Sequence, residues 1–95
     1  MIGKYCIVRG RDSGVFAGTV REINGQKVLM ENVRRIWYWD GAASISQLAK
    51  DGTSEPNNCK FTVRVDSILL LDAIEIIPCT EKAKESIEAV AEWKR

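Results

Sequence analysis

The residues best suited to chemistry lie in one short segment, residues 33–49. It contains two adjacent arginines followed by a run of aromatic residues. These are Arg34, Arg35, Trp37, Tyr38 and Trp39. A guanidinium group donates hydrogen bonds to phosphate or carboxylate oxygens, and an aromatic ring stacks on a nucleobase. The segment therefore predicts a surface that binds either a small anionic nucleotide or an acidic patch on a protein.

Alternation along an extended chain divides these side chains between two faces. One face carries Arg35, Trp37 and Trp39, and the other carries Arg34, Ile36 and Tyr38. Each face thus combines one cation with at least one ring, and either face is a candidate contact surface.

Packing is the competing interpretation for the aromatic residues, because buried rings dominate the cores of small proteins. For Arg34 and Arg35 the competing interpretation is a pair of charges that are solvated or paired with carboxylates. Both interpretations stay open at the level of the sequence.

Ser44 and Gln47 extend the segment as a capping box, in which the serine hydroxyl and the glutamine amide satisfy free backbone N–H groups at a helix start. The helix is short, because Asp51 and Gly52 form a C-terminal stop. The same N–H groups could also meet an anion, although Asp40 would repel it. Ser44 and Gln47 therefore complete the set of candidate binding residues, with a structural role as the alternative.

Catalysis is disfavoured because the chain contains no histidine. This excludes Ser-His and Cys-His nucleophile pairs and the HExxH metal pattern. The cysteines, Cys6, Cys59 and Cys79, are far apart and form no C-x-x-C pair, as expected for small buried residues in a reducing cytosol. We therefore expect a protein that is not an enzyme and that uses neither a cofactor nor a metal.

The length and net charge of the chain further narrow the class of protein and the partners to expect. Ninety-five residues form one domain, 1–95, whose modest core favours a homo-oligomer with Trp37, Tyr38 or the C-terminal helix at the contact. A net charge of +1 argues against a general nucleic-acid binder. The N-terminus does not resemble a secretion signal, and no apolar run is long enough to span a membrane, so we expect a cytoplasmic protein without membrane contact.

The first third of the chain has the pattern of an antiparallel meander. Apolar and β-branched residues over 2–9, 15–23 and 27–32 predict three strands. Asn24 and Gly25 suit a type I′ turn between the second and third strands. The arginine and aromatic segment is either the continuation of the third strand or a fourth strand.

The later chain predicts further strands and a final helix. Residues 59–66 alternate between apolar and polar side chains, as in a half-buried strand. Runs 67–71 and 73–77 lose this alternation, so both of their faces should be covered, and Pro78 stops the second run. Thr80 caps a helix whose apolar stripe ends at Trp93. The expected fold is α+β, a mainly antiparallel sheet (meander or partly open barrel) with a short inserted helix and a C-terminal helix.

Longer strings of the sequence carry a resemblance. They are residues 34–39 (Arg-Arg-Ile-Trp-Tyr-Trp), 41–44 (Gly-Ala-Ala-Ser), 46–49 (Ser-Gln-Leu-Ala) and 58–61 (Asn-Cys-Lys-Phe). These strings resemble a family of small tailed-phage proteins of unknown function, and further matches at residues 1–5, 15–18, 73–77 and 80–83 extend the resemblance nearly end to end. The chain departs from the family pattern at residues 10–13 and at Asp40.

The resemblance implies a phage-encoded accessory protein made in the cytoplasm of an infected bacterium. Small phage proteins without catalytic residues often bind a host protein or sequester a host signal. We therefore expect a non-enzymatic binding protein used in phage–host conflict, which binds a host protein or sequesters a small anionic nucleotide signal. The alternative is a structural or assembly component of the phage particle.

Overall fold

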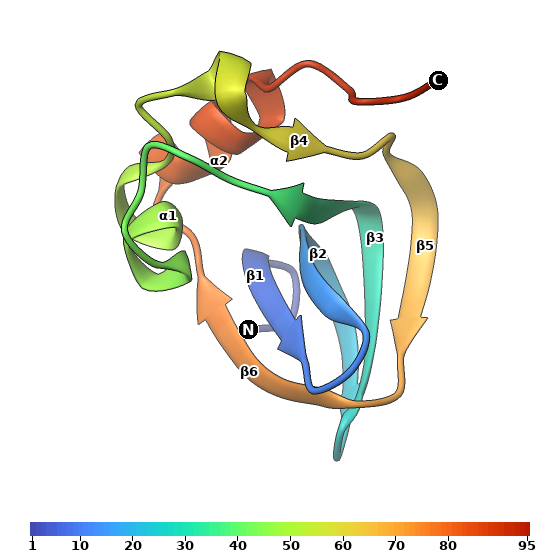
Figure 1. Cartoon of the computed structure of the whole chain (residues 1–95). Coiled ribbons are helices and arrows are strands. Elements are labelled where there is room, and N and C mark those ends of the chain that lie inside the picture. The colour runs from blue at the N-terminus through green and yellow to red at the C-terminus, as the bar shows by residue number, and fades with distance from the viewer.

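The structure is a computed structural model that describes all 95 residues, and it consists of one curled sheet covered at one end by two helices (Figure 1). In chain order the elements are β1 (Tyr5–Gly10), β2 (Gly14–Asn24), β3 (Lys27–Tyr38), α1 (Ile45–Asp51), the 3-10 turn η1 (Pro56–Asn58), β4 (Lys60–Phe61), β5 (Val65–Leu70), β6 (Ala73–Pro78) and α2 (Glu81–Ala89). The strand order is β4-β3-β2-β1-β6, all neighbours are antiparallel, and β5 also pairs with β3. The expected α+β fold is confirmed.

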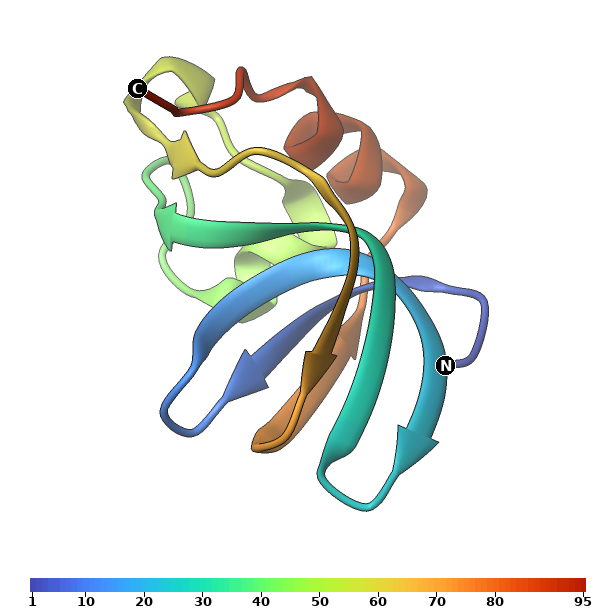
Figure 2. The same cartoon turned by 90° about the vertical axis from the view of Figure 1, so that its right-hand side faces the viewer.

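The arginine and aromatic segment continues the third strand, and a sharp bend lies just before it. At the bend Asn32 has a φ of 47° and the β2–β3 register shifts. Across from it, a Cβ on Gly18 would lie 2.8 Å from Cβ of Val33, so only glycine allows this close approach. The bend makes β5 pair with the first half of β3 and β4 with the second half (Figure 2).

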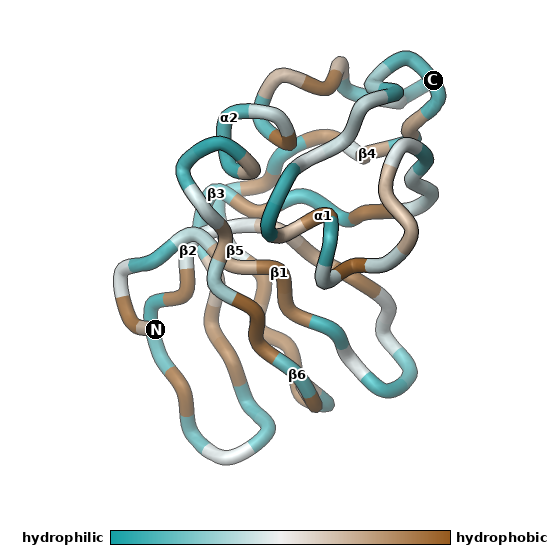
Figure 3. Tube along the Cα trace, turned by 90° about the vertical axis from the view of Figure 1, so that its left-hand side faces the viewer, coloured by the Kyte–Doolittle hydropathy of each residue, from teal (hydrophilic) through white to brown (hydrophobic).

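Two buried clusters fill the two sides of the sheet. Along β1, Cys6 and Val8 point into the curl, while Tyr5 and Ile7 point toward the helices, so both faces of this strand are covered. Figure 3 shows the apolar stretches of β1 and β6 running between turns that are mostly hydrophilic.

The Asn24-Gly25 turn lies one residue later than expected. Asn24 and Lys27 pair as the last residues of their strands, so Gly25 and Gln26 are the two turn residues. Only Gly25 has a positive φ, 62°, which is the pattern of a type II′ turn and not of type I′.

Arg34 is the one charged side chain in the core, with 1% of its surface exposed. Its guanidinium donates to four backbone carbonyl oxygens. They belong to Phe61 (3.1 Å), Thr62 (3.1 Å), Ile87 (3.0 Å) and Val90 (2.9 Å). Burial lowers the pKa of Arg34, but a guanidinium remains protonated in proteins. Arg34 thus joins β3 to β4 and to the end of α2.

These bonds also explain where α2 ends. The expected continuation of its stripe to Trp93 is wrong, because α2 stops at Ala89 and Val90 is already extended. The last carbonyl groups of a helix lack partners within it. Here Arg34 donates to the carbonyls of Ile87 and Val90 at the end of α2, and Arg64 donates to the carbonyl of Glu88. The tail is then free to pair with β4, where N of Trp93 donates to O of Phe61 at 2.9 Å.

The single strand expected over residues 59–66 is also wrong. Pairing with β4 ends at Phe61, and β5 begins at Val65 after the chain has crossed the bend of β3. At this crossing Arg64 turns toward α2 and pairs with Glu88 and Glu92 at 3.3 and 3.1 Å. Val63, placed by alternation on the buried face, is consequently 39% exposed.

The apolar runs of β5 and β6 are not covered on both faces as expected. Leu69, Leu71 and Ile74 are exposed, and Leu71 reaches 65%. The reason is alternation, since Ile68 and Leu70 point into the buried cluster inside the curl and Leu69 between them points outward, where no buried cluster covers it.

Phe61 and Val63 differ in burial, and this predicts that their alanine variants differ in stability. Phe61 is fully buried in the cluster beneath the helices, so Phe61→Ala should lower the free energy of unfolding by about 3–5 kcal/mol. Val63→Ala should lower it by about 0.5 kcal/mol or less, because Val63 is exposed. Urea unfolding of both variants measures the two values, and equal losses would contradict the assigned burial.

Arg34 and Arg35 should likewise differ in their effect on stability. Arg34→Ala leaves four carbonyls without their donor and should cost about 3 kcal/mol or more. Arg35→Ala removes one bond to a carbonyl and should cost about 1 kcal/mol. Thermal and urea unfolding compare the stabilities of the two variants. A loss of stability for Arg34→Ala no larger than that for Arg35→Ala would show that its four bonds contribute little.

Candidate functional site

Arg35, Trp37 and Trp39 line one hollow of about 330 Å³ at the end of β3. The β1–β2 turn forms its other wall, mainly through Asp12 and Ser13. The alternation of side chains had placed these three β3 residues on one face, and the structure brings them together. We call this the Arg35 hollow.

Arg35 forms no ion pair, unlike most arginines of this protein. Arg9, Arg11, Arg21 and Arg64 each pair with a carboxylate. Arg35 is half-buried, its Cζ lies 4.5 Å from the ring centroid of Phe16, and its Nη1 donates to O of Ser13 at 2.5 Å. Its Nε and Nη2 make no hydrogen bond, so Arg35 can still donate to a ligand.

Asp72 holds the turn that faces Arg35. Its carboxylate accepts bonds from the Ser13 hydroxyl at 2.6 Å and from N of Asp12 and Ser13 at 2.7 and 3.0 Å. The Ser13 hydroxyl bond, followed by these backbone bonds, keeps the pKa of Asp72 below its usual range. The carboxylate therefore stays charged at neutral pH and fixes the carbonyl of Ser13 to which Arg35 donates.

The two tryptophans of this hollow have different surroundings. Trp39 is half-buried, packs against the core, and donates from Nε1 to O of Ala42 at 3.2 Å. Trp37 is 62% exposed and stacks on Trp93, with centroids 6.1 Å apart and planes 17° apart. The packing interpretation thus holds for Trp39, whereas Trp37 has free aromatic surface.

Tyr38 lines a second hollow, of about 480 Å³, on the other side of this stacked pair. The remaining lining residues are Asn57, Asn58, Cys59, Lys60 and Trp93. Lys60 pairs with Tyr38 across the strands, and its Nζ lies 5.5 Å from the ring centroid of Trp93. We call this the Lys60 hollow.

Sequence patterns did not indicate Lys60, Trp93 or the two asparagines. They reach the site through long-range contacts, namely the β3–β4 pairing and the tail that runs beside β4 (Figure 1). The one available signal was the string at residues 58–61, which contains Asn58 and Lys60 and belongs to the family resemblance.

The remaining candidate residues lie outside both hollows. Arg34 is enclosed by backbone carbonyls and cannot reach a surface ligand. Oγ of Ser44 accepts from N of Gln47 at 3.2 Å, and Oε1 of Gln47 accepts from N of Ala43 at 2.7 Å. These bonds are the expected caps of α1, so both side chains serve the helix start.

Two of the cysteines, Cys6 and Cys79, offer no reactive thiolate. Burial raises the pKa of Cys79 to about 12 and also raises the pKa of Cys6. At neutral pH both thiols are protonated and therefore poor nucleophiles.

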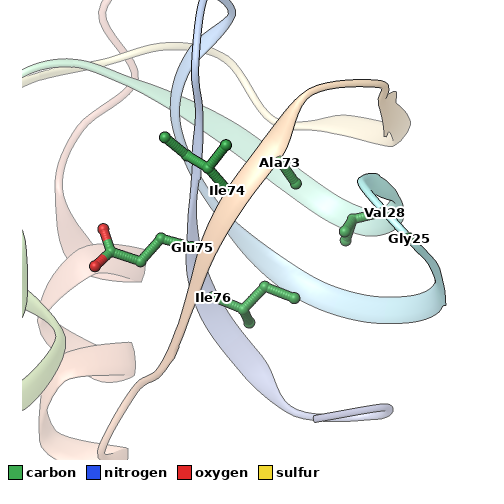
Figure 4. A pocket seen from close by; sticks show the side chains of 6 residues that line it. All are labelled: Gly25, Val28, Ala73, Ile74, Glu75 and Ile76. Carbon is green, nitrogen blue, oxygen red and sulfur yellow. The ribbon is translucent and has the colours of Figure 1, made fainter.

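Another hollow, of about 280 Å³, lies between β6 and the β2–β3 turn (Figure 4) and shares no lining residue with the Arg35 or Lys60 hollow. Four of its six lining residues are apolar, and Glu75 is its one charged residue. In addition, no helix is long and apolar enough to cross a membrane.

Solved structures similar to this chain have the Sm fold. An archaeal Sm protein solved as a heptamer matches with a TM-score of 0.51 and 21% identity over 83% of this chain and 90% of that chain. The SmAP1 heptamer of P. aerophilum has the same TM-score and identity over 83% of this chain and 82% of that chain. At this identity the likeness shows the fold alone. A comparison with curated protein sequences gave no significant match.

A family model matches residues 3–87, which extend from before β1 into α2. The matched part contains the Arg35 hollow and all of the Lys60 hollow except Trp93. An uncharacterised family was expected, and the chain belongs to the family described as Domain of unknown function (DUF6948).

Proposed function

We propose that this protein is a non-enzymatic binding protein that holds a small anionic nucleotide in the Arg35 hollow. In the setting implied by the sequence resemblance, it sequesters a nucleotide signal of the bacterial host during phage infection. The observation that carries the proposal is Arg35 itself, a half-buried guanidinium without a carboxylate partner beside two tryptophans.

The chemistry of the hollow suits such a ligand. The free donors of Arg35 fit phosphate oxygens, and the exposed ring of Trp37 provides a surface for the base. Asp12 also lines the hollow, but its side chain is 85% exposed and lies 3.7 Å from Arg11. Water and Arg11 therefore screen its repulsion of an anion.

A host protein is the second candidate partner, and the exposure of Trp37 and Tyr38 favours it. Exposed tryptophan and tyrosine are the residues that most often dominate protein interfaces. Purification distinguishes the two candidate functions. A nucleotide binder carries a ligand that absorbs near 260 nm, whereas a host binder retains a bacterial protein. Detection of the protein in virions would instead favour the structural or assembly role.

The protein is further proposed to be a homo-oligomer whose copies meet along the open edges of β5 and β6. Both edges lack a partner strand within the chain, and Leu69, Leu71 and Ile74 are exposed beside them. The apolar stripe of α2 is buried inside one copy through Ala83 and Ile87, so it does not provide the contact. The heptameric state of the two Sm proteins supports this arrangement.

Arg35→Ala should weaken nucleotide binding by about 1.5–3 kcal/mol, because a hydrogen-bonded charge is lost. A panel of adenine and guanine mononucleotides, titrated against tryptophan fluorescence, measures the effect. Arg21→Ala is the matched control, since its guanidinium forms an exposed ion pair with Glu31. The nucleotide proposal fails if none of the panel binds, or if the two variants bind alike.

Self-association should depend on the β5–β6 edge. Light scattering at tens of micromolar protein should report an oligomer, and Leu71→Asp combined with Ile74→Asp should shift it toward the monomer by placing charges at the contact. Glu22→Lys, an exposed change on β2 away from these edges, serves as the control. A monomeric wild-type protein would contradict the proposed oligomer.

A further inference from the structure

The Lys60 hollow offers the groups that bind a nucleobase and its phosphate. Tyr38 and Trp93 provide aromatic surface, and both are partly exposed. The side-chain amide of Asn57 makes no hydrogen bond within the chain, while Nδ2 of Asn58 donates to Asp40 at 3.2 Å and leaves its oxygen free. Free amide groups can pair with the edge of a base, as side-chain amides do in nucleic-acid complexes.

The lining of this hollow carries one charge, the ammonium of Lys60, and two carboxylates lie beside it. Lys60 forms no ion pair, and its ammonium lies only against the ring of Trp93. Glu92, beside Trp93, is held by Arg64, whose backbone N–H and guanidinium both donate to it. The carboxylate of Asp40 accepts only from neutral donors, Nδ2 of Asn58 and N of Gly41, so its negative charge remains and the position of Lys60 must outweigh it. Lys60 is the one charged residue among those that line the hollow, and it forms no ion pair.

The two hollows adjoin each other at the stacked rings. Trp37 lines only the Arg35 hollow, Trp93 lines only the Lys60 hollow, and the two indoles stack on one another. Each hollow thus has its own aromatic surface and its own unpaired cation. This arrangement repeats the same recognition chemistry on both sides of one pair of rings.

From this repetition, and resting on the function proposed for the Arg35 hollow, we propose that the protein binds a ligand with two nucleobases joined through phosphate. One base–phosphate unit occupies the Arg35 hollow and the second occupies the Lys60 hollow. The source of this ligand is either a free dinucleotide or a single-stranded oligonucleotide.

Linking two units makes the second contact intramolecular, so a two-base ligand should bind more tightly than one base. We would measure the affinities of AMP, linear pApA, cyclic di-AMP and a six-residue adenylate strand by calorimetry. pApA or cyclic di-AMP should bind at least about tenfold more tightly than AMP. A further gain for the six-residue strand identifies a strand as the source, and its absence identifies a free dinucleotide.

Lys60→Gln should reduce the advantage of the two-base ligand over AMP by about tenfold, whereas Lys60→Arg, which keeps the cation, should retain it. Lys27→Gln, an exposed lysine at the other end of β3, should also retain it. Thermal unfolding verifies that all three variants are folded.

The outcomes separate the two proposals. If AMP binds through Arg35 but two-base ligands gain nothing, the two-base proposal is overturned and the nucleotide site stands. If two-base ligands bind through Lys60 while Arg35→Ala has no effect, the Arg35 site falls, and with it the two-hollow ligand. If no probe binds, both proposals are overturned.

Discussion

The contact on which the structure most depends is the guanidinium of Arg34 surrounded by four carbonyl groups. Two of these carbonyls come from the end of β4 and two from the end of α2. A charge buried without such partners would cost several kcal/mol. Because the side chain starts on β3, it fixes β4 and α2 against the same strand. The exposed residues that follow on β3 are thereby presented from a rigid base.

This arrangement explains why two adjacent arginines have opposite roles. Arg34 faces the helices and satisfies backbone groups that would otherwise be buried without partners. Arg35 faces the other side, where the carboxylate of Asp72 binds the β1–β2 turn and forms no ion pair with the guanidinium. The bend at Gly18 and Asn32 brings that turn, β3 and the aromatic residues into one region.

Sequence patterns predicted local features well and long-range ones poorly. The caps of both helices at Ser44 and Thr80 and the shared face of Arg35, Trp37 and Trp39 are correct, because each depends on residues a few positions apart. Alternation over residues 59–66 was misleading, since it cannot show that the chain changes its pairing partner across a bend. The burial of Arg34 and the position of Trp93 depend on contacts between residues far apart in the sequence, and hydrophobic periodicity gives no information about such contacts.

The distribution of charge explains how a nearly neutral chain could still recognise an anion. A net charge of +1 provides little long-range attraction. Four of the seven arginines, Arg9, Arg11, Arg21 and Arg64, are paired locally with carboxylates. The unpaired cations at the two hollows, Arg35 and Lys60, lie beside aromatic rings. Recognition would then depend on contact geometry and ring stacking more than on general attraction, which favours a small, specific anionic ligand over nonspecific binding to nucleic acid.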